Sequence, residues 1–123
     1  MTKNYGTLTH QPPETLTHGI VSRATDVYSF GVLLWQMYTG SRPWSGLSHA
    51  QVIMQVGNQG ARLKWPSNTP AALRKLGDSC MHPDASQRPT MDEVAAEVAR
   101  LQTELLGGPD GRGPELTTEV EWV

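Results

Sequence analysis

The stretch that decides the fold is Asp26-Val27-Tyr28-Ser29-Phe30-Gly31-Val32-Leu33-Leu34-Trp35-Gln36-Met37-Tyr38. If it is helical, apolar side chains occur on every side of the helix, so no amphipathic stripe can be drawn. A segment of this length that is apolar all round is typical of a buried core helix. We therefore expect a central helix with Asp26 as its N-cap and Gly40 as the residue that ends it.

Three further helices are predicted after the central one. Ser48 is a suitable N-cap for a short helix that stops near Gly57. A second helix is expected to begin at about Pro70, and Thr90 opens a capping-box pattern for the last helix. Residues 1–25 show no sustained period, and their Pro and Gly content predicts an extended segment with turns. Because no strand-forming run longer than a few residues occurs, the predicted fold is mainly α.

Composition excludes several classes of protein. The 123 residues make one domain at most, and their net charge of −2 argues against nucleic acid as a partner. The longest apolar run is far shorter than the roughly 20 residues that a membrane span needs, so we expect no membrane insertion. A lone cysteine, Cys80, and the lack of a signal-peptide pattern favour a cytoplasmic location. Residues 106–123 are rich in Gly and Pro, carry a charge of −3, and are predicted to form a flexible acidic tail.

Four motifs follow one another along the rest of the chain. They are Gly6-Thr7-Leu8-Thr9-His10-Gln11-Pro12-Pro13-Glu14, Asp26-Val27-Tyr28-Ser29-Phe30-Gly31, Thr39-Gly40-x-x-Pro43-Trp44 and Cys80-x-x-Pro83-x-x-Ser86-x-Arg88-Pro89-Thr90. In this order and at these spacings they resemble protein kinases, from the end of the activation segment to the last helix of the C-terminal lobe. The resemblance covers about residues 5–105 and is nearest to the tyrosine-kinase-like Ser/Thr branch. It implies an incomplete kinase domain: the helical C-terminal lobe of the kinase-like fold, with no N-terminal lobe.

The resemblance also implies roles for particular residues. Glu14 and Arg88 would form a structural ion pair, which suits the planar fork of an arginine. Asp26 would be the anchor on the central helix that holds the catalytic loop of the family. Gly6, Thr7 and His10 would lie in the loop that receives the substrate, where the Gly-Thr pair favours Ser/Thr over Tyr specificity. His10 stands where many relatives have Tyr, and Pro12 replaces the usual Ala of the Ala-Pro-Glu motif.

The sequence contains none of the motifs by which kinases transfer phosphate. The chain has no Gly-rich phosphate loop, strand lysine, His-Arg-Asp loop or Asp-Phe-Gly motif. The four histidines are too scattered for a zinc pattern. We therefore expect no catalytic, cofactor-binding or metal-binding residue in this chain, although a complete kinase domain would use ATP and Mg²⁺.

Two functions remain open at this point. The first is a fragment of a Ser/Thr kinase that phosphorylates proteins in signalling and is inactive on its own. The second is a non-catalytic, kinase-like binding module or pseudokinase-type scaffold that presents the helix at residues 48–56 and the loop at residues 7–10 to a protein partner. In both cases the partner is a protein. Because the central helix would lack part of its packing, apolar faces at Val27, Phe30 and Leu34 are expected to be exposed and to cause self-association.

Overall fold

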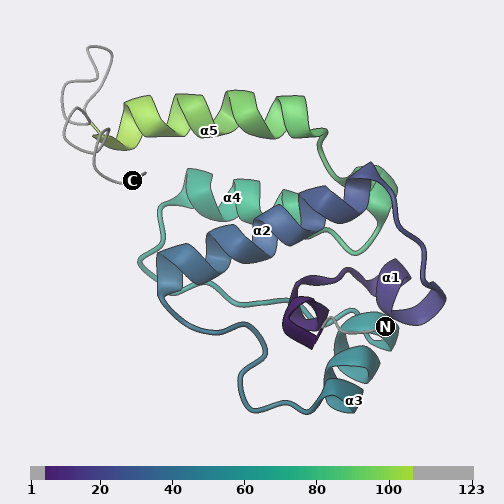
Figure 1. The fold of residues 1–123 in the computed structure, drawn as a ribbon. Helices are drawn as coiled ribbons and strands as arrows, with labels where there is room; N and C mark the ends of the chain where they lie inside the picture. The colour runs from purple at the N-terminus through teal and green to yellow at the C-terminus, as the bar shows by residue number, and fades with distance from the viewer. Residues whose placement is uncertain (1–4, 107–123) are drawn as a thin grey trace. The chain divides into compact units, whose positions relative to one another are not determined.

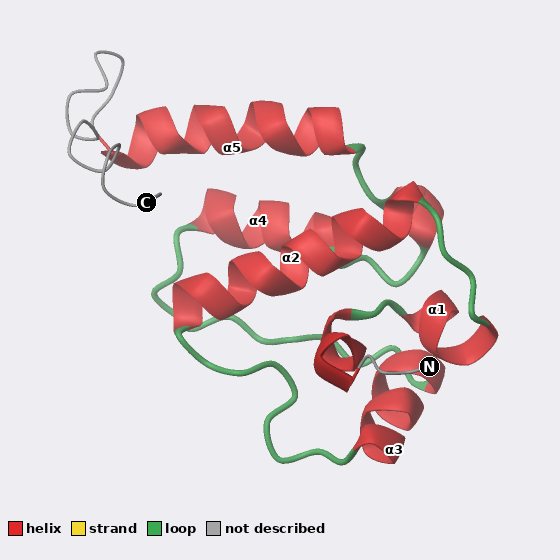
Figure 2. Cartoon of the chain, in the orientation of Figure 1, coloured by secondary structure: helices red, strands yellow, loops and turns green. Residues whose placement is uncertain are grey.

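The computed structural model describes residues 5–106, with side chains for residues 8–104, and its regular elements in this range are helices joined by loops (Figures 1 and 2). It divides into two compact units, Met1–Thr90 and Met91–Val123. The first unit contains η1 (Tyr5–His10), α1 (Pro13–His18), α2 (Arg23–Thr39), α3 (His49–Val52), η2 (Ile53–Asn58), α4 (Ala71–Cys80) and η3 (Ala85–Gln87). The second contains α5 (Met91–Leu106). The described residues contain no strand, so the mainly α prediction is confirmed.

The N-terminal segment differs from its prediction. Instead of an extended chain it forms a 3₁₀ helix, η1, and a short α-helix, α1. Pro13 occupies the first turn of α1, where a missing N–H costs nothing and a fixed φ suits the helix. Gly19 ends α1 in the left-handed conformation, at φ 67°, and its N–H donates to the Thr15 carbonyl over 2.9 Å. The proline pair therefore starts a helix here.

The central helix α2 starts earlier than the sequence predicted. Its N-cap is Ser22, and the prediction of Asp26 as the cap is wrong. The Ser22 hydroxyl accepts from the Ala24 N–H over 3.1 Å, while the Thr25 hydroxyl accepts from the Ser22 N–H over 2.9 Å. This reciprocal pair satisfies two N–H groups that a helix start leaves open. Asp26 lies in the first turn, where a negative charge suits the helix dipole. Gly40 ends the helix at φ 72°, as expected.

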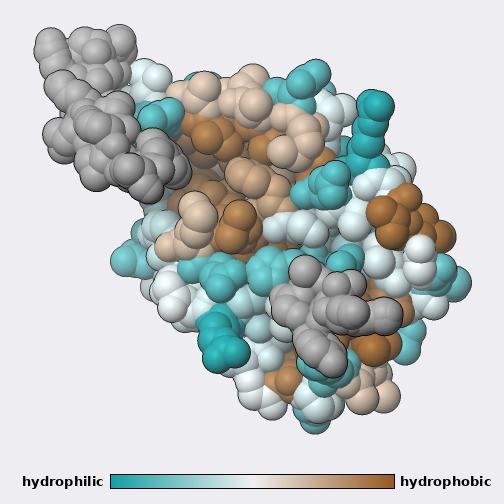
Figure 3. Space-filling view, viewed as in Figure 1, coloured by the Kyte–Doolittle hydropathy of each residue, from teal (hydrophilic) through white to brown (hydrophobic). Residues whose placement is uncertain are grey.

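Only part of the surface of α2 is buried, whereas the apolar pattern of its sequence predicts burial on all sides. Its buried apolar side chains are those of Val27, Tyr28, Val32 and Trp35. Leu33 and Met37 are 44% and 67% exposed, and apolar atoms show at the surface over α2 in Figure 3. The expectation of an exposed Val27 is wrong, since this side chain is 2% exposed, while Phe30 and Leu34 are half-buried.

The core of the first unit forms where α2 packs against α4 and the segment before it. Tyr28, Val32, Trp35, Leu63 and Met81 make one buried cluster, against which Trp44 and Trp65 pack. The Trp35 indole N–H donates to the Lys64 carbonyl over 2.9 Å, so the extended segment before α4 is held against α2.

A glycine allows the close approach of α2 to α4. A Cβ on Gly31 would lie 2.7 Å from Met81 Cγ and 2.8 Å from Cys80 Cβ, so no larger residue fits here without movement. The predicted start of α4 near Pro70 is confirmed, and Leu76 and Cys80 are buried.

The helix predicted from Ser48 is also confirmed. The Ser48 hydroxyl accepts from the Gln51 N–H over 3.1 Å, and the Gln51 side chain accepts from the Ser48 N–H over 2.8 Å. After one α-helical turn the chain widens into the π-helical segment η2, which packs against α1. A Cβ on Gly57 would lie 2.8 Å from Thr17 Cγ2, so this glycine allows the contact with α1.

The second unit is described as a single helix, α5, which begins directly after Thr90 as predicted. On its exposed surface the Arg100 guanidinium pairs with Glu97 and, over 2.6 Å, with Glu104. The predicted acidic tail lies outside the described residues, apart from Leu106. None of the helices within residues 5–106 combines the length and the apolar character that crossing a membrane requires.

Candidate functional site

Glu14 and Arg88 are 74 residues apart in the sequence and meet side by side in the structure. Arg88 Nη1 lies 2.8 Å from Glu14 Oε2, and Arg88 Nη2 lies 2.9 Å from Glu14 Oε1. This is a bidentate pair in which two parallel N–H groups donate to the two carboxylate oxygens. The Arg88 side chain is fully buried and that of Glu14 is 18% exposed.

The remaining donors of Arg88 are used by backbone carbonyls. Nε donates to the His82 carbonyl over 2.8 Å, and Nη1 also donates to the Ala24 carbonyl over 3.0 Å. Nη2 lies 3.5 Å from the Pro83 carbonyl. One guanidinium thus connects the first turn of α1, the start of α2 and the loop after α4, and its buried charge is compensated on each side.

The electrostatics of this pair are set by burial and by the opposite charge. Burial acts to raise the pKa of the Glu14 carboxyl, but hydrogen bonds from Arg88 and the backbone together with the positive charge outweigh it, so the pKa is lowered. The Arg88 guanidinium also lies 5.0 Å from the centre of the Tyr28 ring, a cation–π distance. Burial raises the pKa of Tyr28 to about 12, so this ring stays neutral. The lowered pKa keeps the Glu14 carboxyl charged and the raised pKa keeps the Tyr28 hydroxyl protonated at neutral pH.

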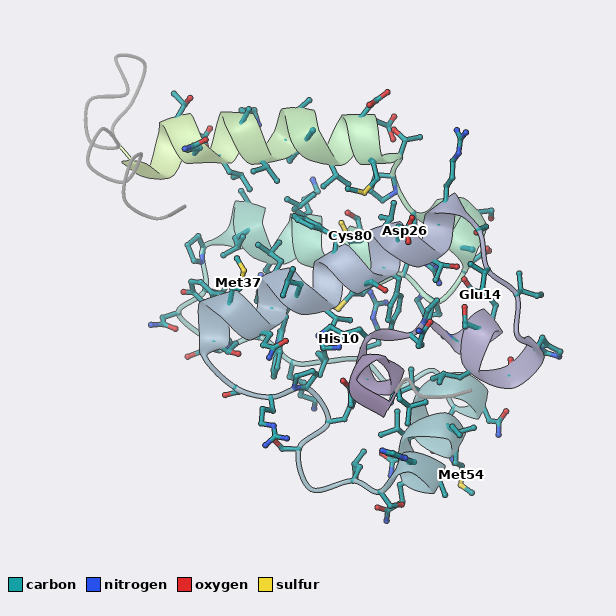
Figure 4. All side chains as sticks on the ribbon, viewed as in Figure 1. His10, Glu14, Asp26, Met37, Met54 and Cys80 are labelled. Carbon is teal, nitrogen blue, oxygen red and sulfur yellow. The ribbon has the colours of Figure 1, made fainter. Side chains whose placement is uncertain are left out.

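A second polar cluster lies where η1 meets the middle of α2 (Figure 4). The Ser29 hydroxyl donates to the His10 carbonyl over 2.8 Å, and His10 Nε2 lies 3.0 Å from Gln36 Oε1. His10 Nδ1 lies 3.0 Å from the Thr9 hydroxyl. Both the backbone and the ring of His10 are therefore held in place on α2.

This cluster borders a groove of about 560 Å³. Its walls are Thr9 and His10 from η1, Gln36 from α2, residues 42–47 of the following loop, and His49 from α3. Trp44 in this loop has φ 56°, a left-handed conformation that is uncommon for an aromatic residue. Its ring packs against the core cluster, so packing holds the loop in this conformation. Backbone strain of this kind is concentrated at functional sites.

The structure places the other predicted site residues as follows. Gly6 and Thr7 lie in η1, in the same short helix as His10. Asp26 is exposed on the first turn of α2, at the opposite end of that helix from Gln36, so the structure does not bring it to the groove. Within residues 5–106 no group of three or more His, Cys, Asp or Glu residues is arranged to hold a metal ion.

The groove residues Gln36 and Arg42 were not singled out by sequence reasoning. Trp44 was quoted as part of the Thr-Gly-x-x-Pro-Trp motif, which is the one signal that pointed to this loop. Gln36 carries no local signal, because its contact with His10 spans 26 residues.

Comparison with known proteins shows the family of this chain. The family model described as "Protein tyrosine and serine/threonine kinase" matches residues 2–98. The probable serine/threonine-protein kinase SIS8 of Arabidopsis thaliana is 35% identical over 94% of this chain and 12% of its own length. The insulin-like receptor of Drosophila melanogaster is 43% identical over 69% of this chain and 4% of its own length.

A third relative, mitogen-activated protein kinase kinase kinase 13-A of Xenopus laevis, is 28% identical over 95% of this chain and 12% of its own length. The chain thus spans only a small part of the relatives it matches. The match over most of the chain, together with the helical fold and the order of the motifs, means that this chain belongs to the protein tyrosine and serine/threonine kinase family.

Proposed function

We propose that this chain is the substrate-binding part of a protein Ser/Thr kinase domain and that it does not transfer phosphate on its own. The observation that carries the proposal is the groove between η1, α2 and the loop at residues 42–47. It lies beside the helix that holds Gly6 and Thr7, the pair that the family resemblance places in the substrate loop. The Glu14–Arg88 pair supports this function by holding α1, which directly follows η1, against the rest of the lobe.

Specificity for Ser and Thr is supported by two observations. Gly6-Thr7 matches the Ser/Thr pattern of the substrate loop. Several relatives carry names of serine/threonine-protein kinases, among them the plant protein and two from Dictyostelium discoideum.

The residues present do not fit Mg²⁺ and ATP. Phosphoryl transfer depends on placing the phosphates and metal ions among fixed donors, and the motifs that provide these donors are not in the sequence. The described residues offer no cluster of acids or histidines that would replace them. ATP and Mg²⁺ would therefore be bound by other parts of a complete kinase domain.

Two measurements on the purified chain test this assignment. Titration calorimetry with ATP in the presence of Mg²⁺ should give no heat of binding, and incubation with labelled ATP and a serine peptide should give no labelled peptide. Binding of ATP or labelling of the peptide by this chain would contradict the proposal.

A second candidate function is a kinase-like binding module without catalysis. The observation that favours it is the exposed apolar pair Ile53 and Met54 on η2, which are 37% and 53% exposed. A binding experiment with an immobilised chain separates the two candidates. Under this second function the wild-type chain would retain a partner protein and the Met54→Glu variant would not. Replacement of the serines and threonines of that partner would leave its binding unchanged.

A further inference from the structure

Among the residues that the structure describes, the lining of the groove at residues 42–47 includes three basic side chains and no acid. Arg42 and two histidines, His10 and His49, belong to its walls, together with Trp44. The Arg42 side chain is exposed, and among the described residues it has no carboxylate partner. An arginine in this position presents a planar set of donors that fits a carboxylate with two parallel hydrogen bonds.

The charge of the whole first unit points the same way. Met1–Thr90 holds eight Lys and Arg residues against four Asp and Glu, a formal charge of +4, although the complete chain carries −2. Such a surplus attracts anionic ligands and speeds their association.

The four acids of the first unit are all placed away from the groove. Glu14 is paired with Arg88, and Asp26 lies in the first turn of α2. Asp78 accepts the indole N–H of Trp65 over 2.9 Å. Asp84 accepts from Ser86 at η3. Because the described residues that line the groove include no acid, none of them neutralises Arg42 or repels a negatively charged ligand.

We infer that the groove binds an acidic stretch of the protein substrate, with an Asp or Glu side chain of the substrate on the Arg42 guanidinium. This inference rests on the proposed function, because it names the substrate class of the same site. His10 is already oriented by Ser29 and Gln36, so its part of the groove wall is ordered before a ligand arrives. Trp44 is half-buried and belongs to the groove wall, so its exposed part offers apolar contact area for the aliphatic part of the peptide.

The test measures binding of three labelled peptides to the full chain by fluorescence anisotropy. Each peptide has a central serine; the flanking residues are glutamate in the first, glutamine in the second and lysine in the third. The glutamate peptide should bind about tenfold more tightly than the glutamine peptide, the effect of one charge-assisted contact. Its affinity should fall as salt is added, because the groove is open to solvent.

Two charge-reversal variants locate the site. Arg42→Glu should weaken binding of the glutamate peptide about tenfold and leave the glutamine peptide nearly unchanged. Arg74→Glu is the matched control, because Arg74 is an exposed arginine on α4 outside the groove and undergoes the same charge change. Neither side chain is buried, so both variants should fold, which circular dichroism checks.

Each other outcome is decisive. If the lysine peptide binds as tightly as the glutamate peptide, the acidic preference is wrong while peptide binding by this face stands. If Arg42→Glu and Arg74→Glu weaken binding equally, the effect belongs to net charge and the assignment to the groove is overturned. If none of the three peptides binds, both the inference and the proposed function fail.

Discussion

Removal of either partner of the Glu14–Arg88 pair should destabilise the chain strongly. In Glu14→Ala, the buried Arg88 keeps its bonds to three carbonyls but loses both carboxylate bonds, which leaves a buried cation without an opposite charge. Breaking such a pair costs about 3–5 kcal/mol. Because Glu14 is 18% exposed and water reaches one side of the pair, we expect the lower end of this range, about 3 kcal/mol.

Arg88→Ala should cost more than Glu14→Ala. It removes the donors of the Ala24, His82 and Pro83 carbonyls and leaves a space against the Tyr28 ring. We expect a loss of about 4–5 kcal/mol, which is a large part of the roughly 5–15 kcal/mol by which a domain is stable. Arg88→Lys should restore little of this lost stability, since a single ammonium group cannot reach all the acceptors that surround the planar guanidinium.

Urea unfolding of the wild type, the two single variants and the double variant gives the coupling energy between the side chains. The double variant should lose about 2–3 kcal/mol less unfolding free energy than the sum of the two single losses. Once one partner has been removed, removing the other no longer leaves a buried charge unpaired. Losses that add within about 0.5 kcal/mol would refute the reasoning, because they would mean that the two groups do not interact in solution.

Four further results are expected. The pKa of Glu14 in the folded state lies below its ordinary value of 4.5, so the ion pair contributes fully to stability above pH 4.5 and less as the pH falls through the folded-state pKa. The unfolding free energy of Glu14→Gln should therefore fall less than that of the wild type between about pH 6 and pH 3. Gly31→Ala should lower the unfolding free energy measured in urea by about 1–3 kcal/mol, because the added Cβ collides with Met81 and Cys80. This loss exceeds the gain of about 1 kcal/mol that alanine gives to a helix. A more stable variant would contradict this packing. Cys80 is fully buried and burial raises the pKa of its thiol to about 11, so a thiol reagent should modify it only at the rate of unfolding, whereas fast labelling in native buffer would disprove this. Met37→Glu should reduce self-association in sedimentation velocity and change unfolding free energy by less than about 0.5 kcal/mol, and unchanged association would exclude the exposed face of α2 as its cause.

The position of the central helix was predictable because the density of apolar residues is a local property of the sequence. The residue at which this helix starts was not predictable in the same way, because Asp26 and Ser22 both suit the beginning of a helix. Asp26 favours the first turn through the helix dipole, whereas Ser22 and Thr25 together satisfy two N–H groups. The two-bond capping box decides the boundary.

Other differences come from contacts that no local pattern reveals. The Pro and Gly content of residues 1–25 predicts an extended segment with turns, yet Pro13 fits the first turn of α1. The exposure of Leu33 and Met37 depends on which elements pack against α2, and hydropathy alone does not contain that information. Only the family resemblance pointed to the meeting of Glu14 with Arg88 across 74 residues, and nothing pointed to Arg42 in the groove.

The most direct test of the account is phosphate transfer by a chimera. The ATP-binding and catalytic segments of the plant relative's kinase domain would be joined in frame to residues 5–106 of this chain. The chimera should label a serine peptide and not the matched tyrosine peptide, and adding Arg88→Ala to it should lower its unfolding free energy and its labelling together. A folded chimera that labels neither peptide, or that labels only tyrosine, would contradict the claim that this chain is the substrate-binding part of a Ser/Thr kinase domain.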